Sequence, residues 1–437
     1  MTAKPASLDL EKARHRIDWA SLAPLVTLLA IMVVFGFLAT EFFSLGTISQ
    51  TLKRGSVLAI VATGLTFVLL CAEIDLSVGT MALFSACVCG VIWAQPFAAG
   101  AREIQDQRKT ALSLVDKRVT AERKRDAAIK EREALTDVSD KRREQIDKTI
   151  RESTEVIDKA TAAIAQAPAG GTGAEFRSTA IAIAIPFLVA LILGGVSGTL
   201  TVSSGLPSFI ITLAMMYMAN GLARFVTLSQ KYDVPQFLKE LGNAPLAKLS
   251  LFGRTLEIPQ SAVLAAVVML VAHVVLQHTR FGRYVYMTGG NRQAARLAGV
   301  RTERIVIGSL MICAVTAACG GMVNAGRLES VSLDQNADLL LEAVACVVLG
   351  GTSLFGGEGG IGRTAVGVFT FTILRVGLEA TDPARLIKFS WLSQAWKQEL
   401  LKMSWVTQFD LLRPFLLGIV LMLALVIHGR LVRKHHE

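Results

Sequence analysis

The sequence predicts an all-α polytopic membrane protein with about ten transmembrane helices and one inserted extramembrane helical hairpin. Hydrophobic residues make up 52% of the 437 residues, charged residues only 18%, and the mean hydropathy is +0.50, whereas soluble domains carry about 25% charged residues. The charges are also concentrated, since 32 of the 80 lie between Phe97 and Ser178. This distribution excludes a soluble enzyme, a disordered chain and a secreted disulfide scaffold.

Apolar runs mark the expected spans, because hydrocarbon about 30 Å thick requires about 20 residues at roughly 1.5 Å per residue. Helices are expected because they satisfy their own backbone hydrogen bonds in lipid. The eighth and ninth runs are short and flanked by glycine. The ten candidates cover residues 22–40, 54–72, 76–94, 178–198, 207–227, 258–277, 304–323, 339–355, 364–380 and 409–428.

Basic residues in short loops predict the orientation, because such loops stay in the cytoplasm. The segment 278–304 holds six arginines against one acid, Glu303, and both chain ends are basic. Ten spans place all three on the cytoplasmic side. Basic residues in the loop between spans five and six soften the contrast; they are Lys231, Lys239, Lys248 and Arg254. The net charge of +10 is ordinary for such a protein, so no nucleic-acid partner is expected.

The charged insertion at 97–177 divides the chain into three parts, with an N-terminal tail and three spans before it (1–96) and seven spans after it (178–437). It holds 17 basic and 15 acidic residues between Phe97 and Ser178, and ten spans place it outside the cell. Its apolar positions predict an antiparallel helical hairpin, and a solvated, partly disordered loop is the alternative. One seam comprises Ile146, Ile150, Ser153, Ile157, Ala160 and Ile164, and a weaker partner seam Ile104, Ala111, Val115 and Val119. Turn residues at 136–140 and glycines at 170–173 bound the second helix.

An amphipathic stretch at 384–406 alternates apolar residues at helical spacing with charged ones, and it contains Trp391, Trp396 and Trp405. Tryptophans are enriched at membrane interfaces. This pattern predicts a helix that lies on the outer leaflet.

A few polar residues close to apolar spans are candidates for a substrate pathway, because polar groups at membrane depth usually face a cavity. Glu73 and Asp75 interrupt the apolar sequence between spans two and three. Alternatively, Asp75 or Ser77 caps the third helix at the membrane surface. The pathway candidates are Glu73, Asp75, Ser77, Asn220, Asn324 and Glu342.

The cytoplasmic segment 278–304 contains a short basic helix that Gly299 would end. Such a helix suits docking to another protein, and anchoring to the inner leaflet is the alternative. The docking candidates are Gly289, Gly290, Asn291, Arg292, Gln293, Ala294, Ala295, Arg296 and Gly299.

Catalytic or metal-ligand spacing is not evident, so neither an enzyme nor a metal site is expected. The segment Gly357–Thr364 matches a phosphate-binding loop except that Arg363 replaces lysine. That loop requires a strand before it in an aqueous domain, whereas its neighbours here are apolar spans. Its glycines are better explained by close helix crossing or a tight turn.

Four motifs, in family order, resemble those of ribose/xylose-type permeases of bacterial ABC sugar importers. The segments Gly64–Gly79, Pro207–Leu213, Gly289–Gly299 and Leu349–Gly357 are similar to stretches around that family's "GIDLSVG", "P-P/S-F-I-V-T-L", "GGN-x-EAA-xxx-G" and "IGGTSLxGG". The sequence departs from these patterns at two charged positions, because Glu73 stands where glycine is usual and Gln293 where glutamate is usual. The insertion at 97–177 and the segment 384–406 lie outside the pattern.

The resemblance implies the pore of an importer for a monosaccharide, usually built from two paired permease subunits in the bacterial inner membrane. A periplasmic sugar-binding protein would feed it. A separate ATPase would drive it through residues 289–299, so the partner uses the ATP and no cofactor is expected here. Both termini would be cytoplasmic and the insertion periplasmic. Glycine-rich hinges in spans 2–5 and 7–10 also predict two inverted halves.

Two other functions remain open from the sequence. Related permeases share this architecture, so the cargo is alternatively a branched-chain amino acid or another small polar solute. A membrane receptor or scaffold that acts through its helical hairpin is the third possibility. In that case the loop at 289–299 would have no partner.

Overall fold

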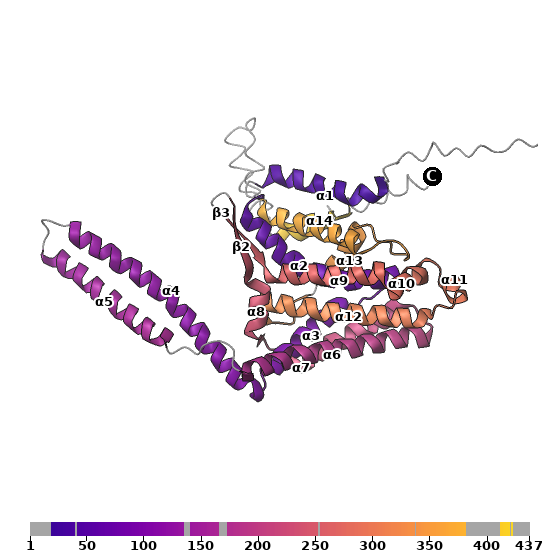
Figure 1. The fold of residues 1–437 in the computed structure, drawn as a ribbon, viewed down its shortest axis with the longest axis horizontal. Coiled ribbons are helices and arrows are strands. Elements are labelled where there is room, and N and C mark those ends of the chain that lie inside the picture. The colour runs from indigo at the N-terminus through magenta and orange to yellow at the C-terminus, as the bar shows by residue number, and fades with distance from the viewer. Residues whose placement is uncertain are drawn as a thin grey trace, which may run out of the picture. The chain divides into compact units, whose positions relative to one another are not determined.

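The computed structural model describes residues 19–39, 42–134, 140–165, 173–251, 254–336, 338–381, 411–419 and 421–422. These residues are mainly helical (Figure 1), which confirms the predicted all-α class. The helices are α1 Trp19–Leu38, α2 Leu45–Leu70, α3 Val78–Trp93, α4 Ala99–Ala134, α5 Asp140–Ala165, α6 Gly173–Ser204, α7 Ser208–Thr227, α8 Gln236–Asn243, α9 Gln260–His278, α10 Arg280–Gly290, α11 Arg292–Leu297, α12 Thr302–Arg327, α13 Leu339–Leu349 and α14 Ile361–Ala380, with a short 3-10 helix at Pro96–Ala98. The predicted segment 384–406, the turn residues 136–139, the glycines 170–172 and both termini lie outside the described residues.

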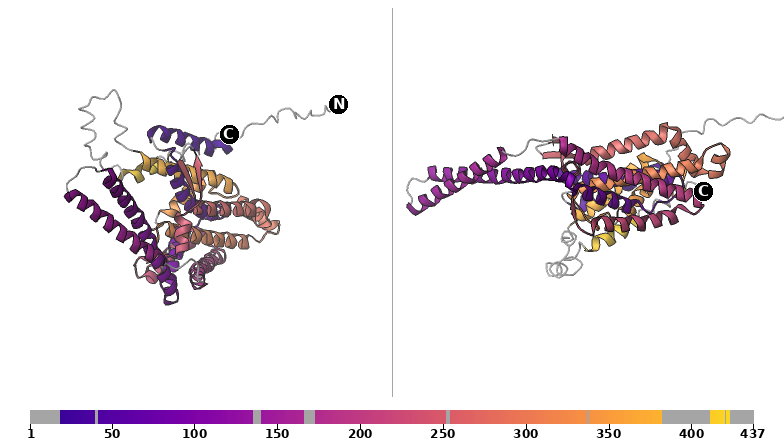
Figure 2. Two further views of the ribbon diagram at one scale, coloured as in Figure 1. Left: turned by 60° about the vertical axis from the view of Figure 1, so that its left-hand side comes forward. Right: turned by 90° about the horizontal axis from the view of Figure 1, so that it is seen from below.

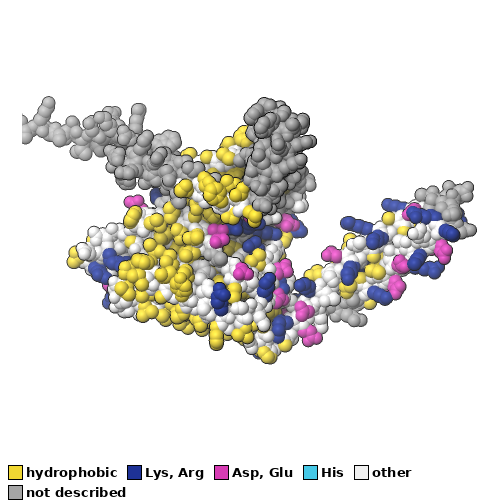
Figure 3. Space-filling view, turned by 180° about the vertical axis from the view of Figure 1, so that it is seen from behind, with side chains coloured by type: hydrophobic (Ala, Val, Ile, Leu, Met, Phe, Trp, Pro, Cys, Tyr) yellow, Lys and Arg dark blue, Asp and Glu magenta, His cyan; other side chains and the backbone are white. Residues whose placement is uncertain are grey.

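The chain forms two compact units, one of residues 1–89 with 185–437 and one of residues 90–184. Helix α2 lies at the centre of the first unit, where it packs against α9, α12, α13 and α14. Of the most apolar stretch of α2, 78% is buried, compared with 22% for each of α6, α7 and α9. These three helices therefore present apolar side chains outward, as helices in contact with lipid or with another subunit do. Figure 3 shows a broad hydrophobic area on one face of this unit.

Among the described residues, six helices are long and apolar enough to span a membrane, or seven if the bent pair of α3 and Pro96–Arg132 counts as one. Helices are present at the first nine predicted spans, but the count of ten is not confirmed. Helix α13 has only 11 residues, which is about 16 Å at 1.5 Å per residue. At the tenth predicted span, only residues 411–419 and 421–422 are described, and they are helical.

The α2–α12 interface depends on small residues that bring the two backbones close together. A Cβ on Gly64 would lie 1.8 Å from Thr316 Oγ1 and 2.8 Å from Cys313 Cα. From the α12 side, a Cβ on Gly320 would lie 2.4 Å from Val61 Cγ2 of α2. Without side chains at these positions, the helices pack closely, as membrane helices do at glycine-rich crossings.

Four short strands, which no pattern in the sequence predicted, lie in the loops of the first unit. β2 (Pro245–Leu251) pairs with β3 (Arg254–Pro259), and β1 (Tyr232–Asp233) pairs with β4 (Ser330–Val331), both antiparallel. Two of the basic residues in the loop assigned to the outside form ion pairs with acidic residues. Lys239 pairs with Asp233 at 2.6 Å and Lys248 pairs with Glu257 at 3.3 Å.

The second unit contains the predicted hairpin, in which α4 and α5 pack along each other (Figures 1 and 2). The predicted seam of α5 is present, with Ile146, Ser153, Ile157 and Ala160 buried. The predicted partner seam was wrong at Val115 and Val119, which are exposed, whereas Ile104 and Ala111 are half-buried. The buried side chains of α4 are Ala101, Gln105, Ala121 and Ala128. Figure 3 shows charged side chains along this unit.

Candidate functional site

Three of the sequence motifs meet at one end of the first unit, around the C-terminal end of α2. The backbone N–H of Gly357 donates to the carbonyl oxygen of Leu70 at 3.0 Å. Gly289 lies against the same carbonyl, since a Cβ there would be 1.8 Å from Leu70 O. Tyr286 in α10 donates its hydroxyl to Gly359 O at 3.1 Å, and burial raises the pKa of this phenol. The loop after α13 and the loop after α10 are thus joined through α2.

The short helix α11 is fixed on its inner side. The Asn291 side chain caps it by accepting from the backbone N–H of Ala294 at 2.9 Å. Ala295 and Val300 are buried in an apolar cluster with residues of α2, α9 and α10. Gly299 ends the turn in the left-handed region, with φ +82°. These contacts hold α11 in a fixed position on the surface of the unit.

Both arginines of α11 have partners within this chain. Arg292 forms an ion pair with Glu73, which follows α2. Arg296 contacts Glu303 at 2.8 Å and Thr302 at 3.0 Å. These residues line a cavity of about 390 Å³ that also reaches the loop between α6 and α7. Glu73 therefore lies beside α11, whereas the pathway candidates Asn324 and Glu342 line a different cavity.

Two exposed apolar side chains at this end were not singled out by the sequence analysis. Leu297, the last residue of α11, and Phe355, in the loop after α13, are each 90% exposed. Apolar residues in basic or glycine-rich loops give no periodic signal, so only the structure reveals them. Exposed apolar side chains of this size are a feature of surfaces that bind other molecules.

The break between α2 and α3 is held by α7. Ser208 Oγ accepts from the backbone N–H of Ile74 at 2.9 Å, and Thr212 Oγ1 accepts from that of Leu76 at 3.1 Å. Asp75 accepts from the N–H and hydroxyl of Ser77 at 2.9 and 2.6 Å. Asp75 and Ser77 are buried, and the bonds between them form a local turn just before α3.

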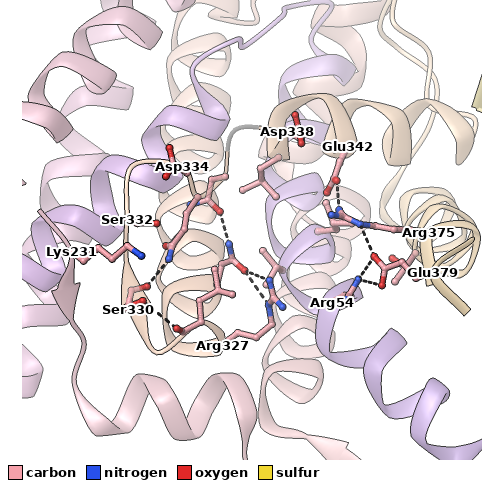
Figure 4. Close-up of a pocket in the computed structure, with 18 residues that line it drawn as sticks. Arg54, Lys231, Arg327, Ser330, Ser332, Asp334, Asp338, Glu342, Arg375 and Glu379 are labelled. Carbon is pink, nitrogen blue, oxygen red and sulfur yellow. Dashed lines mark hydrogen bonds and ion pairs between the residues drawn. The ribbon is translucent and has the colours of Figure 1, made fainter. Parts of the chain in front are cut away.

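A second, larger cavity of about 620 Å³ lies toward the other end of the unit (Figure 4). Helix α2 has 26 residues and is about 39 Å long, and Arg54 in its first half lines this cavity. The ends of α12 and α14 and the segment before α13 form the remaining walls. Two pathway candidates, Asn324 and Glu342, lie here, whereas Asn220 on α7 instead accepts from Arg224 at 2.9 Å.

The cavity walls carry a chain of ion pairs. Arg54 contacts Glu379 at 2.5 Å, Arg375 contacts Glu379 at 3.7 Å, and Arg375 also pairs with Glu342. On the opposite wall, Arg327 donates to Asn324 Oδ1 at 2.9 and 3.1 Å. Figure 4 shows both groups lining one space.

The glycine-rich segment that resembles a phosphate-binding loop has a different context here. Helix α13 precedes it, and Gly360 is the N-cap of α14. The N–H of Gly357 is already bonded to Leu70. The segment is therefore a packing loop against α2.

Comparison with known proteins identifies a family. The model of the family described as branched-chain amino acid transport system / permease component matches residues 47–425. The ribose import permease protein RbsC of Escherichia coli (strain K12) is 27% identical over 354 residues, covering 81% of this chain and 84% of the relative. The fructose import permease protein FrcC of Rhizobium meliloti is 27% identical over 395 residues, covering 86% and 83%. The autoinducer 2 import system permease protein LsrC of Photorhabdus laumondii is 25% identical over 358 residues, covering 81% of each. No solved structure matches significantly.

Proposed function

Because the chain belongs to the family of branched-chain amino acid transport system / permease components, we propose that it is the membrane-spanning pore subunit of an ABC importer for a monosaccharide of the ribose/xylose type. The observation that carries this proposal is that three motif segments meet at the C-terminal end of α2: that end itself, the end of α10 and the loop after α13. A protein that docks there contacts α11. The ion pair between Arg292 and Glu73 connects α11 to the break between α2 and α3.

The proposed partners follow from this arrangement. A separate ATPase docks on α11 and on the exposed Leu297 and Phe355. A periplasmic binding protein delivers the sugar at the opposite end, and a second permease subunit, most simply another copy, completes the pore. The chain lies in the bacterial inner membrane with both termini in the cytoplasm and residues 97–177 in the periplasm. It uses no cofactor itself, because the partner consumes the ATP.

The sugar cargo is supported by the names of relatives that cover most of this chain, which are import permeases for ribose, fructose and autoinducer 2. A branched-chain amino acid is the second candidate, since the family description names that cargo. The walls of the larger cavity favour the sugar. They are rich in charged and amide groups, whereas an aliphatic side chain requires an apolar pocket.

The test is ATP-driven uptake by the assembled transporter in proteoliposomes, with the variants Arg296→Glu and Leu297→Asp. Arg296→Glu places a carboxylate beside Glu303, and Leu297→Asp removes the exposed apolar contact. We expect both to reduce uptake and copurification of the ATPase while the amount of chain in the membrane stays unchanged. Arg301→Gln, on an exposed residue of the same loop, is the matched control. Normal uptake by both variants would refute the docking assignment.

A further inference from the structure

The 620 Å³ cavity near Arg54 and Arg327 has features of a binding site, beyond those of a water-filled passage. We infer that it binds a small uncharged polyol, such as a monosaccharide, through hydroxyl hydrogen bonds made by this chain itself. The inference rests on the proposed function for the kind of cargo. It adds that cargo selection also takes place in the permease, at named residues. The volume of the cavity falls within the range of about 300–1,000 Å³ that is typical of small-molecule pockets.

The charges of the lining balance. Its four basic residues are Arg54, Lys231, Arg327 and Arg375, and its four acidic residues are Asp334, Asp338, Glu342 and Glu379. Arg54 and Arg375 are engaged with Glu379 and Glu342. An ion that enters the cavity must lose its hydration shell, and a lining without net charge does not compensate for that loss by Coulomb attraction. An uncharged polyol has a smaller desolvation cost, and its hydroxyls can bond both the donors and the acceptors of the lining.

Buried polar atoms without partners point to a ligand. Among the residues that the structure describes, Thr372 Oγ1, Gln335 Oε1 and Asn336 Nδ2 are buried without a hydrogen bond. All three residues line the cavity. Buried polar groups are normally hydrogen-bonded. The Thr372 hydroxyl can donate and accept, Gln335 Oε1 accepts and Asn336 Nδ2 donates. A hydroxyl-rich molecule bound in the cavity would supply the missing partners.

Thr372 is the strongest of the three indications. Its side chain is 1% exposed, and Gly55 of α2 faces it, since a Cβ at Gly55 would lie 3.3 Å from Thr372 Oγ1. Most threonines within helices of this unit donate to a carbonyl one turn earlier, as Thr370 does to Val366 at 2.7 Å. Thr372 Oγ1 has no such bond among the described residues, although the residue lines the cavity.

The opposite wall is preorganised. Asn324 donates to Asn336 Oδ1 at 2.7 Å and accepts from Arg327 at 2.9 and 3.1 Å. Gln335 donates to Ser330 O at 2.8 Å. These bonds hold the amides in place, so the unpartnered Asn336 Nδ2 and Gln335 Oε1 are presented at fixed positions. Fixed donors and acceptors reduce the entropy cost of binding.

The experiment measures saturation-transfer difference NMR on the full chain in nanodiscs, with D-ribose, D-gluconate and L-leucine as probes. The test variant is Thr372→Val, and the control is Thr370→Val on the same helix, which is equally buried and does not line the cavity. For the wild type we expect saturation of the ribose protons, little of gluconate and little of leucine.

The two variants should separate binding from stability. Thr372→Val removes a hydroxyl without a protein partner, so thermal stability should be unchanged or higher, while ribose binding weakens about 2- to 10-fold, as for one lost hydrogen bond. Thr370→Val loses its bond to Val366 and should lower stability while ribose binding is retained.

The inference is overturned if ribose shows no saturation, if leucine or gluconate equals it, or if Thr372→Val binds ribose like the wild type. The proposed function fails separately, if the assembled transporter shows no ATP-driven uptake. Ribose binding without uptake would contradict only the pore assignment, and uptake without binding only the site.

Discussion

Arg292, the first residue of α11, forms an ion pair with Glu73, which lies in the non-helical segment between α2 and α3. The Glu73 side chain is 9% exposed and that of Arg292 is 41% exposed. One member of the pair belongs to the surface proposed to dock the ATPase. The other begins the break whose backbone is held by Ser208 and Thr212 of α7. The pair therefore links the docking element directly to the membrane helices.

If this link transmits movement of α11, separating the charges should uncouple transport. We expect Glu73→Gln to reduce ATP-driven uptake more than ATPase copurification, because α11 remains but its tie to the break is lost. Arg292→Gln leaves Glu73 buried without its cation, which costs about 1–3 kcal/mol, and should also lower the melting temperature. Arg301→Gln serves as the control. Recovery of uptake in the exchanged pair Glu73→Arg with Arg292→Glu would support the link, and equal uptake by all variants would contradict it.

The close approach of α10 to α2 gives a prediction with a neighbouring control. At Gly289 a Cβ would lie 1.8 Å from Leu70 O, so Gly289→Ala must displace backbone and should cost about 1–3 kcal/mol. At Gly290 nothing lies within 4 Å of a Cβ, and alanine favours the helix by about 0.5–1 kcal/mol. In thermal unfolding measured in detergent, Gly289→Ala should therefore lower the melting temperature, and Gly290→Ala should leave it unchanged or raise it slightly. Similar melting temperatures for the two variants would argue against this packing.

The helical hairpin should fold by itself, because α4 and α5 bury a shared seam within a separate compact unit. We expect isolated residues 98–175 to show strong helical circular dichroism and a cooperative melt. Ile157→Asp places a carboxylate at a position that is 8% exposed and should abolish the melt, since an unpaired buried charge is costly. Its neighbour Val156 is 43% exposed, so Val156→Asp should change stability by less than about 0.5 kcal/mol. A non-cooperative signal from the unmodified fragment would favour the solvated-loop alternative.

The side of the membrane on which the hairpin lies can be tested at its turn. A cysteine introduced by Ser139→Cys should react with a membrane-impermeant thiol reagent on intact spheroplasts. Arg301→Cys, in the loop proposed to be cytoplasmic, should react only after the membrane is broken. The unsubstituted chain measures background from its own cysteines, most of which are buried. Protection of position 139 in intact cells would place the hairpin in the cytoplasm and change the span count by one.

The sequence by itself determined the membrane class, the hairpin and its α5 seam, because apolar runs and helical periodicity are local properties of the chain. The short helix within 289–299 and its end at Gly299 were also predicted, since alanines and a following glycine are local signals. The β2–β3 pair was missed, because a short amphipathic loop gives a weak signal next to long apolar spans. The α4 seam was misassigned, because which small residues face α5 depends on how the helices pack.

Only the tertiary structure decided which polar residues act together. Six residues were pathway candidates, yet they lie in different places. Glu73 pairs with Arg292 beside α11, and Asp75 and Ser77 form a local turn. Asn220 bonds Arg224, and Asn324 and Glu342 line the larger cavity. Sequence spacing carries no information about such partners, because they come from different helices. The long-range packing of α2 against α12 and α14 brings Arg54, Arg327 and Glu379 to one cavity, and no local pattern encodes that meeting.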